Sequence, residues 1–259
     1  MTNAYQHIKF SIDDRVARIT FDRPPLNIFN IAMMREIGQA LDDCVSHRDL
    51  AAVVFAAAPG TNAFSAGVAV EEHVDETVYQ MLDSFHDIFR TLEQLAKPAI
   101  AVVDDLALGG GCELVAACDI VIATDRARFG QPEIKLGVFP PVAAILLPRI
   151  IGEKRARELI FTGDLIDAAT ALQLGLVNYV MPGAELEGKT QEILDKLREL
   201  SAVALEMARR AMDLSSGASF DSTLARVENL YLHELMRSED AREGVKAFME
   251  KRKAEWRHR

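Results

Sequence analysis

Apolar residues follow two different periods along the first two thirds of the chain. Unbroken or alternating apolar runs, which are typical of β-strands, occupy residues 7–12, 16–22, 50–58, 97–105 and 119–124. Apolar residues three or four apart, which are typical of amphipathic helices, form two stripes: Ile31, Met34, Ile37, Leu41 and Val45, and then Val78, Met81, Leu82, Phe85, Phe89 and Leu92. The first two strands flank a turn at 13–15 and predict a hairpin.

Strands that alternate with helices predict βαβ units and a largely parallel sheet, and therefore an α/β fold. Asn30 stands where it would cap the first helix, residues 59–67 predict a loop, and Gly175 ends a helix that begins near 167. From Leu186 onward the pattern is helical, with a break near 215–220. We expect a β/α core with the active site over 1–185 and a C-terminal helical region over 186–259.

Composition narrows the class of function. The 259 residues are 49% hydrophobic, and 39 acidic against 29 basic residues give a net charge of −10. A nucleic-acid-binding protein would show the opposite balance, and the basic C-terminal segment 250–259 is short. The three cysteines have no metal-ligand or disulfide spacing, which favours a reducing compartment. Because residues 1–10 lack the apolar run of a signal peptide and no apolar stretch reaches transmembrane length, we predict a cytoplasmic protein without membrane contact.

A glycine triplet precedes a single glutamate in the apolar stretch "LGGGCELVAACDIVI", residues 108–122. Glycines at a helix start let a ligand approach the backbone and present N–H groups to an anion or oxyanion. The alternative is a tight strand-to-helix turn without a ligand. A dinucleotide-binding G-x-G-x-x-G motif would need glycine in place of Leu114.

Two glutamates are the candidate catalytic groups. A carboxylate at position 113 costs several kcal/mol in an apolar segment unless it is paired or protonated. Glu133 follows Pro132 twenty residues later, where an acid in the first turn of a helix would also be favourable on its own. Two glutamates delivered to one pocket from separate segments would share a water molecule and divide the roles of acid and base.

Several segments together resemble the crotonase superfamily, which includes the enoyl-CoA hydratases and isomerases. They are "NAFSAGVAV" (62–70), "ALGGGCELVAACDIVIA" (107–123), "ARFGQPEIKLG" (127–137), "FTGDLIDAATALQLGLVNYV" (161–180) and "REGVKAFMEKRKAEW" (242–256). The resemblance implies a crotonase-type spiral of ββα repeats with a C-terminal helical trimerisation region. It also implies an acyl-CoA thioester as substrate and a homotrimer or a hexamer built from two trimers.

The resemblance also assigns roles to particular residues. Glu113 and Glu133 match the two catalytic glutamates of the hydratases, and the backbone N–H groups of Val68 and Gly110 would form the oxyanion hole. Further residues would contact the acyl group or the CoA moiety, the last two of them reaching the nucleotide end from a neighbouring subunit: Ala66, Phe139, Pro141, Pro25, Leu26, Phe248 and Lys251. In the alternative interpretation Phe248 is a core residue in register with Val245, and Lys251 is a solvated charge.

The chain departs from ordinary enoyl-CoA hydratases at two places. "FPPVAAILLPRI" (139–150) stands where they have a glycine-rich loop, and Ala69 replaces the usual aspartate. A stiff, apolar loop would reshape the acyl pocket. Together with "RPPLNIFN" (23–30), it resembles the cyclohexa-1,5-diene-1-carbonyl-CoA hydratases, whose substrate is a flat ring, although such a loop would equally suit a linear or branched chain.

The sequence therefore predicts a hydro-lyase that adds water across a double bond conjugated to a CoA thioester. One alternative is an enoyl-CoA isomerase with Glu133 as its sole base. A second is a non-catalytic, RNA-binding member of the same fold, against which the negative net charge and the two glutamates argue. We expect no metal and no cofactor apart from the CoA of the substrate.

Overall fold

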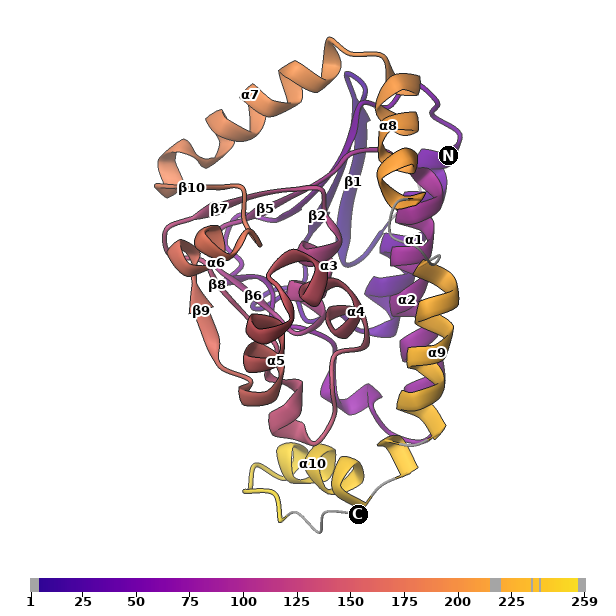
Figure 1. The fold of residues 1–259 in the computed structure, drawn as a ribbon, viewed down its shortest axis with the longest axis vertical. Helices are drawn as coiled ribbons and strands as arrows, with labels where there is room; N and C mark the ends of the chain where they lie inside the picture. The colour runs from indigo at the N-terminus through magenta and orange to yellow at the C-terminus, as the bar shows by residue number, and fades with distance from the viewer. Residues whose placement is uncertain (1–4, 215–219, 234, 238, 256–259) are drawn as a thin grey trace.

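The strands are divided between a larger and a smaller sheet (Figure 1). The computed structural model describes residues 5–214, 220–233, 235–237 and 239–255. Within these residues the larger sheet has the order β1–β2–β3–β5–β7–β10: Ile8–Asp13, Val16–Phe21, Ala52–Ala57, Ala99–Val103, Ile120–Thr124 and Tyr179–Met181. The smaller sheet has the order β4–β6–β8–β9: Ala63–Ser65, Leu106–Leu108, Arg128–Gly130 and Leu165–Asp167.

The predicted hairpin is confirmed by the antiparallel pairing of β1 with β2. Asp14 and Arg15 both have positive φ, 42° and 63°, as the central residues of a type I′ turn require. Every other neighbouring pair in the larger sheet is parallel. The sheet is therefore largely parallel, as predicted.

The chain repeats one path through the two sheets. It passes through β3, β4 and the helix α2 (Val78–Leu95), and then through β5, β6 and α3 (Gly110–Ala117). A third pass through β7 and β8 ends in the 3₁₀ helix η2 (Pro132–Leu136), which α4 (Pro141–Ile150) follows. Because each pass adds one parallel strand to each sheet, the predicted α/β fold, a spiral of ββα repeats, is confirmed.

Helix α1 (Ile31–Val45) begins where the sequence predicts it. The side-chain oxygen of Asn30 accepts a hydrogen bond from the N–H of Met33 at 3.0 Å, which is the N-cap geometry. At the other end the apolar stripe continues through buried Cys44, whereas Val45 is 57% exposed. The expectation that Val45 belongs to the stripe was wrong. With 3.6 residues per turn, Cys44, three residues after Leu41, faces the core, and Val45 turns away from it.

Two segments predicted as loops contain regular structure. Residues 59–67 include β4, and residues 139–150 include α4, which starts at Pro141 and contains Pro148. A three-residue strand is too short to show an alternating pattern, and the prolines of 139–150 suggested a loop. Proline is nevertheless favourable in the first turn of a helix, where its missing N–H would have no partner in that helix.

The remaining helices cover the sheets and their edges. They are α5 (Glu153–Thr162), α6 (Ala168–Leu174), α7 (Leu186–Arg198), α8 (Ala202–Leu214), α9 (Phe220–His233) and α10 (Glu239–Met249), with short 3₁₀ turns at Val70–Glu72, Gly183–Glu185 and Leu235–Arg237. Ile193 and Leu194 of α7 pack on one face of the larger sheet. Figure 1 shows α9 running beside α2 and α10 at the end of the molecule opposite α7.

Helix α6 ends at Gly175, whose φ of 84° is the left-handed cap that the sequence predicts. The expected break at 215–220 lies, apart from Phe220, outside the described residues. The division at residue 185 and the trimerisation role of the C-terminal helices stay predictions. Within the described part of the chain, no helix combines the length and apolar character that a membrane span requires.

Candidate active site

A cavity of about 400 Å³ lies between all three passes of the spiral and helices α9 and α10. Both candidate glutamates form part of its wall. The structure also brings most of the other predicted site residues to this wall: Ala66, Val68, Gly110, Phe139, Pro141 and Phe248. Residues that are up to 182 positions apart in the sequence thus surround one space.

Glu113 comes from the first turn of α3 and is 2% exposed. Its Oε1 accepts a hydrogen bond from the N–H of Ala143 at 2.9 Å. Burial raises the pKa of this carboxyl group from 4.5 to about 7, although the backbone N–H groups of Ala143 and Val142 act in the opposite direction. A carboxyl group with this pKa can exchange a proton near neutral pH.

The first turn of α4 explains why the contact to Glu113 is made by backbone. Pro140 is the N-cap and Pro141 the first residue of α4, and neither has an N–H group. The first free N–H groups of the helix are therefore those of Val142 and Ala143, and an anion at this end also interacts favourably with the helix dipole. Glu113 takes the place of the missing side-chain cap.

Glu133 comes from η2, directly after Pro132. The side chain is half-buried, and its Oε2 is buried without a hydrogen-bond partner among the described residues. Burial raises the pKa of Glu133 well above its usual value, and the charge of Glu113 raises it further. The two carboxyl groups interact, and Glu113 has the N–H groups of Val142 and Ala143 as donors, whereas Glu133 has its own N–H. The favoured state therefore has Glu113 ionised and Glu133 protonated.

The glycine triplet is explained by close approach as well as by the turn. Gly109 has a φ of 51°, and a Cβ atom there would lie 2.5 Å from Oε1 of Glu133. A Cβ atom on Gly110 would lie 2.8 Å from Cγ2 of Val68 and 3.0 Å from Cζ of Phe85. Side chains at these two positions would therefore fill the space between the glutamate and the opposite wall.

Two backbone N–H groups border the same space. Phe29 and Val68 form a parallel β-bridge. The N–H of Phe29 donates to the carbonyl oxygen of Gly67 at 2.8 Å, and the N–H of Ala69 donates to the carbonyl oxygen of Phe29 at 2.9 Å. Successive N–H groups alternate in direction along an extended segment, so that of Val68 points away from Phe29. Gly110 is the first residue of α3, and its N–H has no partner within that helix.

Three predicted substrate-binding residues lie away from the cavity wall. Leu26 is bonded to a wall residue, because its carbonyl group accepts a hydrogen bond from the N–H of Ala66 at 3.0 Å, whereas the carbonyl group of Pro25 accepts one at 2.7 Å from Asn62, which is not part of the wall. Lys251 is exposed at the end of α10. Phe248 lines the cavity of its own chain and is 51% exposed, so the alternative that placed it in the core is wrong.

Among the wall residues that were not predicted as site residues are His73, Phe85, Lys135 and Tyr231. Phe85 was predicted only as part of a helix core. Tyr231 is 1% exposed and packs edge to face on Phe139, with ring centroids 5.3 Å apart. Nδ1 of His73 lies 3.0 Å from the carbonyl oxygen of Ala69, and burial lowers the pKa of this imidazole. Nothing in the local sequence pattern distinguishes these residues from core or surface positions.

No group of three or more His, Cys, Asp or Glu side chains that could hold a metal ion occurs among the residues that the structure describes. Glu113 and Glu133 are the acidic groups of the cavity wall. A pair of carboxyl groups with different environments can take and give a proton within one site. The arrangement is suited to acid–base chemistry on a bound small molecule.

Comparisons with known proteins agree with this geometry. The family model of enoyl-CoA hydratase/isomerase matches residues 11–259. The chain is 38% identical to a probable enoyl-CoA hydratase of Mycobacterium tuberculosis, over 98% of this chain and 99% of that protein. It is also 38% identical to the cyclohexa-1,5-dienecarbonyl-CoA hydratase of Thauera aromatica, over 95% of both chains.

Solved structures of enoyl-CoA hydratases have the same fold as this chain. The crystal structure of an enoyl-CoA hydratase from Mycobacterium avium subsp. paratuberculosis superposes with a TM-score of 0.86, at 26% identity over 97% of this chain and 98% of that one. An enoyl-CoA hydratase subunit from Geobacillus kaustophilus superposes with a TM-score of 0.77 at 32% identity, over 99% of this chain and 100% of that one. The chain belongs to the enoyl-CoA hydratase/isomerase family, within the crotonase superfamily, and is an enzyme of the hydratase type.

Proposed function

We propose that this enzyme adds water across a carbon–carbon double bond conjugated to a CoA thioester, with Glu113 and Glu133 as its catalytic residues. The observation that carries the proposal is the pair of carboxyl groups in one cavity, both with raised pKa. Hydration needs one group that takes a proton and one that gives a proton. The two glutamates supply both.

The thioester carbonyl oxygen binds to the N–H groups of Val68 and Gly110. Attack of water on the β-carbon moves an electron pair through the conjugated system and forms an enolate, so negative charge develops on this oxygen. Donors that are already in place stabilise the charge, and removal of one donor from such a site typically costs about 3 kcal/mol in the transition state.

The protonation states of the glutamates assign their roles. Ionised Glu113 accepts a proton from the water molecule while the oxygen of that water molecule forms a bond to the β-carbon. Protonated Glu133 then gives its proton to the α-carbon, and the enolate returns to a thioester. Glu113 is left protonated and Glu133 ionised, and proton exchange with solvent after product release restores the starting state.

Replacement of either glutamate by glutamine tests this mechanism. Glutamine keeps the size of the side chain but cannot accept or give the proton. We expect Glu113→Gln and Glu133→Gln each to lower hydration of crotonyl-CoA by about 10²–10⁴-fold, measured as loss of the ultraviolet absorbance of the enoyl thioester. Near-normal rates in either folded variant would contradict the two-carboxylate mechanism.

The same variants separate hydration from isomerisation. An isomerase that uses Glu133 as its sole base would be only slowed by Glu113→Gln and would move the double bond of a 3-enoyl-CoA without adding water. Product analysis by chromatography distinguishes a hydroxyacyl-CoA from an isomeric enoyl-CoA. The hydrogen bond from Ala143 to Glu113 favours hydration, because it stabilises the ionised form of Glu113 and so supplies a base in addition to the acid Glu133.

We further propose a cyclic dienoyl-CoA as the acyl substrate. The relative from Thauera aromatica supports this specificity, and so does the wall formed by Phe139, Pro140 and Pro141, which is apolar and stiffened by two prolines. Turnover of cyclohexa-1,5-dienecarbonyl-CoA and of crotonyl-CoA by the same preparation decides the question. Much faster hydration of crotonyl-CoA would defeat the ring specificity but leave hydration itself intact.

The CoA moiety would leave the cavity past Pro25 and Leu26, with Phe248 and Lys251 near its nucleotide end. That Phe248 lines the cavity of its own chain supports a contact within one subunit. A homotrimer or hexamer, a cytoplasmic location and the lack of any cofactor beyond the CoA of the substrate stay predictions.

A further inference from the structure

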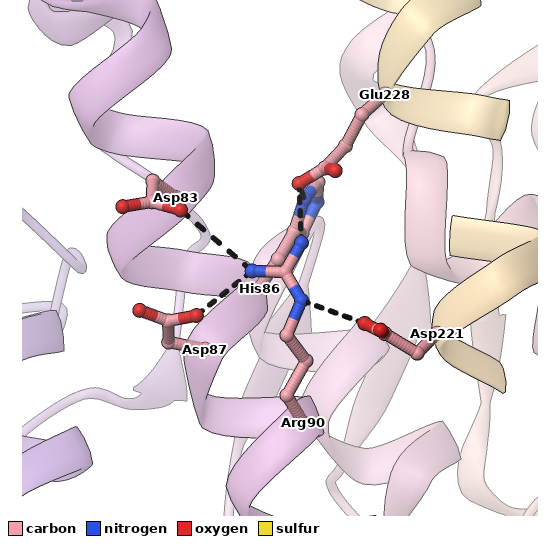
Figure 2. A network of polar contacts seen from close by, with 6 residues as sticks. All are labelled: Asp83, His86, Asp87, Arg90, Asp221 and Glu228. Atoms are coloured by element: carbon pink, nitrogen blue, oxygen red, sulfur yellow. Dashed lines mark hydrogen bonds and ion pairs between the residues drawn. The ribbon is translucent and has the colours of Figure 1, made fainter. Parts of the chain in front are cut away.

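A cluster of polar side chains lies between α2 and α9 (Figure 2). We call it the α2–α9 cluster. Its members on α2 are Asp83, His86, Asp87 and Arg90, and its members on α9 are Asp221 and Glu228. Nothing in the proposed chemistry uses these residues directly.

The hydrogen bond between His86 and Glu228 is the buried part of this cluster. His86 is fully buried, and its Nδ1 lies 2.7 Å from Oε1 of Glu228. Because a carboxylate only accepts, Nδ1 carries the hydrogen. The other ring nitrogen, Nε2, is buried and has no partner among the described residues.

Arg90 attaches α9 to α2 at two places. Its Nη2 donates to the same oxygen of Glu228 at 2.9 Å, and its Nε donates to Asp221 at 3.0 Å. Asp87 on α2 accepts from Nη1 at 2.8 Å. Although burial raises the pKa of Glu228, the hydrogen bond from His86 and the charge of Arg90 lower it below its usual value. Glu228 is therefore ionised, and both bonds to it are charge-assisted.

Each helix carries a cavity residue next to its member of the buried pair. Phe85 directly precedes His86, and Tyr231 lies one helical turn after Glu228; both line the cavity. Tyr231, Glu113 and Glu133 all belong to the wall of this one cavity, and Tyr231 packs edge to face on Phe139, another wall residue.

A buried histidine at this position is costly. A buried nitrogen without a partner costs about 1–3 kcal/mol, and the surrounding face of α2 is otherwise made of Phe, Leu, Met and Val side chains that carry no such cost. Packing of two helices does not require it. The bond to Glu228 does fix the rotation and height of α9 relative to α2, and with them the place of the Tyr231 ring.

We infer that His86 and Glu228 are positioning residues that set where Tyr231 stands over the two glutamates, and thereby which size of acyl group the cavity accepts. The inference rests on the proposed function, because an acyl group is the ligand that this wall would sort by size. Residues of the cluster need not touch the substrate. They act through Tyr231 and through its edge-to-face partner Phe139.

The test is a ratio of two rates in each variant. We measure kcat/KM for crotonyl-CoA and for cyclohexa-1,5-dienecarbonyl-CoA, and divide one by the other. Glu228→Ala should change this ratio by about tenfold or more, the lower end of the discrimination that a pocket wall gives for one methylene group. A variant that only unfolded in part would lower both rates equally and leave the ratio unchanged.

Two further variants separate positioning from general destabilisation. Glu228→Gln keeps an oxygen that accepts from His86, so its ratio should return towards the wild-type value. Asp221→Ala removes the other contact of Arg90 on α9, ten residues or about 15 Å of helix before Tyr231, and should leave the ratio unchanged.

A wild-type ratio in Glu228→Ala, or an equal change in Asp221→Ala, would overturn the positioning role while hydration by the wild-type enzyme stands. If the wild-type enzyme hydrates neither thioester, the proposed function fails first and this inference fails with it. The measurement on the unaltered protein distinguishes the two failures before any variant is made.

Discussion

Replacing Glu113 by glutamine should make the protein more stable at alkaline pH while it removes activity. The carboxyl group is 2% exposed and interacts with the N–H of Ala143. Glutamine has the same shape and keeps an oxygen that can accept this hydrogen bond. It differs in that it never carries a charge, so the cost of burying that charge disappears.

The size of the effect follows from the shift of the pKa. Burial raises the pKa of Glu113 from 4.5 to about 7, and about 1.4 kcal/mol for each pKa unit gives about 3 kcal/mol. Between these two values the folded protein keeps a proton that the unfolded chain releases, so the free energy of unfolding falls as pH rises. The buried carboxyl group of Glu113 therefore costs the wild-type protein no stability below pH 4.5, and its full cost applies above pH 7.

The measurement is urea unfolding of wild type and Glu113→Gln, followed by circular dichroism at one fixed protein concentration, because subunit association would also contribute. The advantage of the variant should grow by about 2 kcal/mol between pH 5 and pH 8. Glu158→Gln, on the exposed face of α5, is the control and should differ from wild type by the same small amount, within about 0.5 kcal/mol, at both pH values. An advantage of Glu113→Gln that does not change with pH would refute the reasoning.

Two glycine substitutions test close contacts in and beside the site. Gly109→Ala places a methyl group 2.5 Å from Oε1 of Glu133 at a φ of 51°, so kcat for crotonyl-CoA should fall by about 10²-fold; a kcat within twofold of wild type would contradict this. Gly244→Ala, on α10, places a methyl group onto the carbonyl oxygen of Leu136 and should cost about 1–3 kcal/mol by urea unfolding. Gly38→Ala, on α1 with open space around it, is the matched control and should be neutral or stabilising; equal losses in both variants would exclude the contact as the cause.

That both glutamates belong to one site could be expected from the sequence, because each stands in a conspicuous local setting. Glu113 interrupts an apolar run after three glycines, and Glu133 follows a proline at the start of a helical turn. The sequence could not show that the partner of Glu113 is the backbone of Ala143. That contact depends on α4 starting at Pro141, in a segment that its prolines made look like a loop.

The smaller sheet and the far wall of the cavity could not be predicted for a different reason. Each strand of the smaller sheet has three residues, which is fewer than the about four to eight over which an alternating pattern identifies a strand. Tyr231 belongs to a helix 98 residues beyond Glu133, and no local pattern says against which part of the core a terminal helix will pack. Tertiary packing decides both.

The atoms that bind Glu113, a proposed catalytic residue, are different from those that line the cavity beside it. The N–H groups of Val142 and Ala143 act on Glu113, whereas the side chains of Phe139, Pro140 and Pro141 line the cavity. A backbone donor is the same whatever side chain its residue carries. Substitutions at 139–141 that keep α4 helical can therefore reshape the cavity without moving the Glu113 carboxylate. For this reason the departure of this segment from ordinary enoyl-CoA hydratases bears on which acyl group is bound and not on whether water is added.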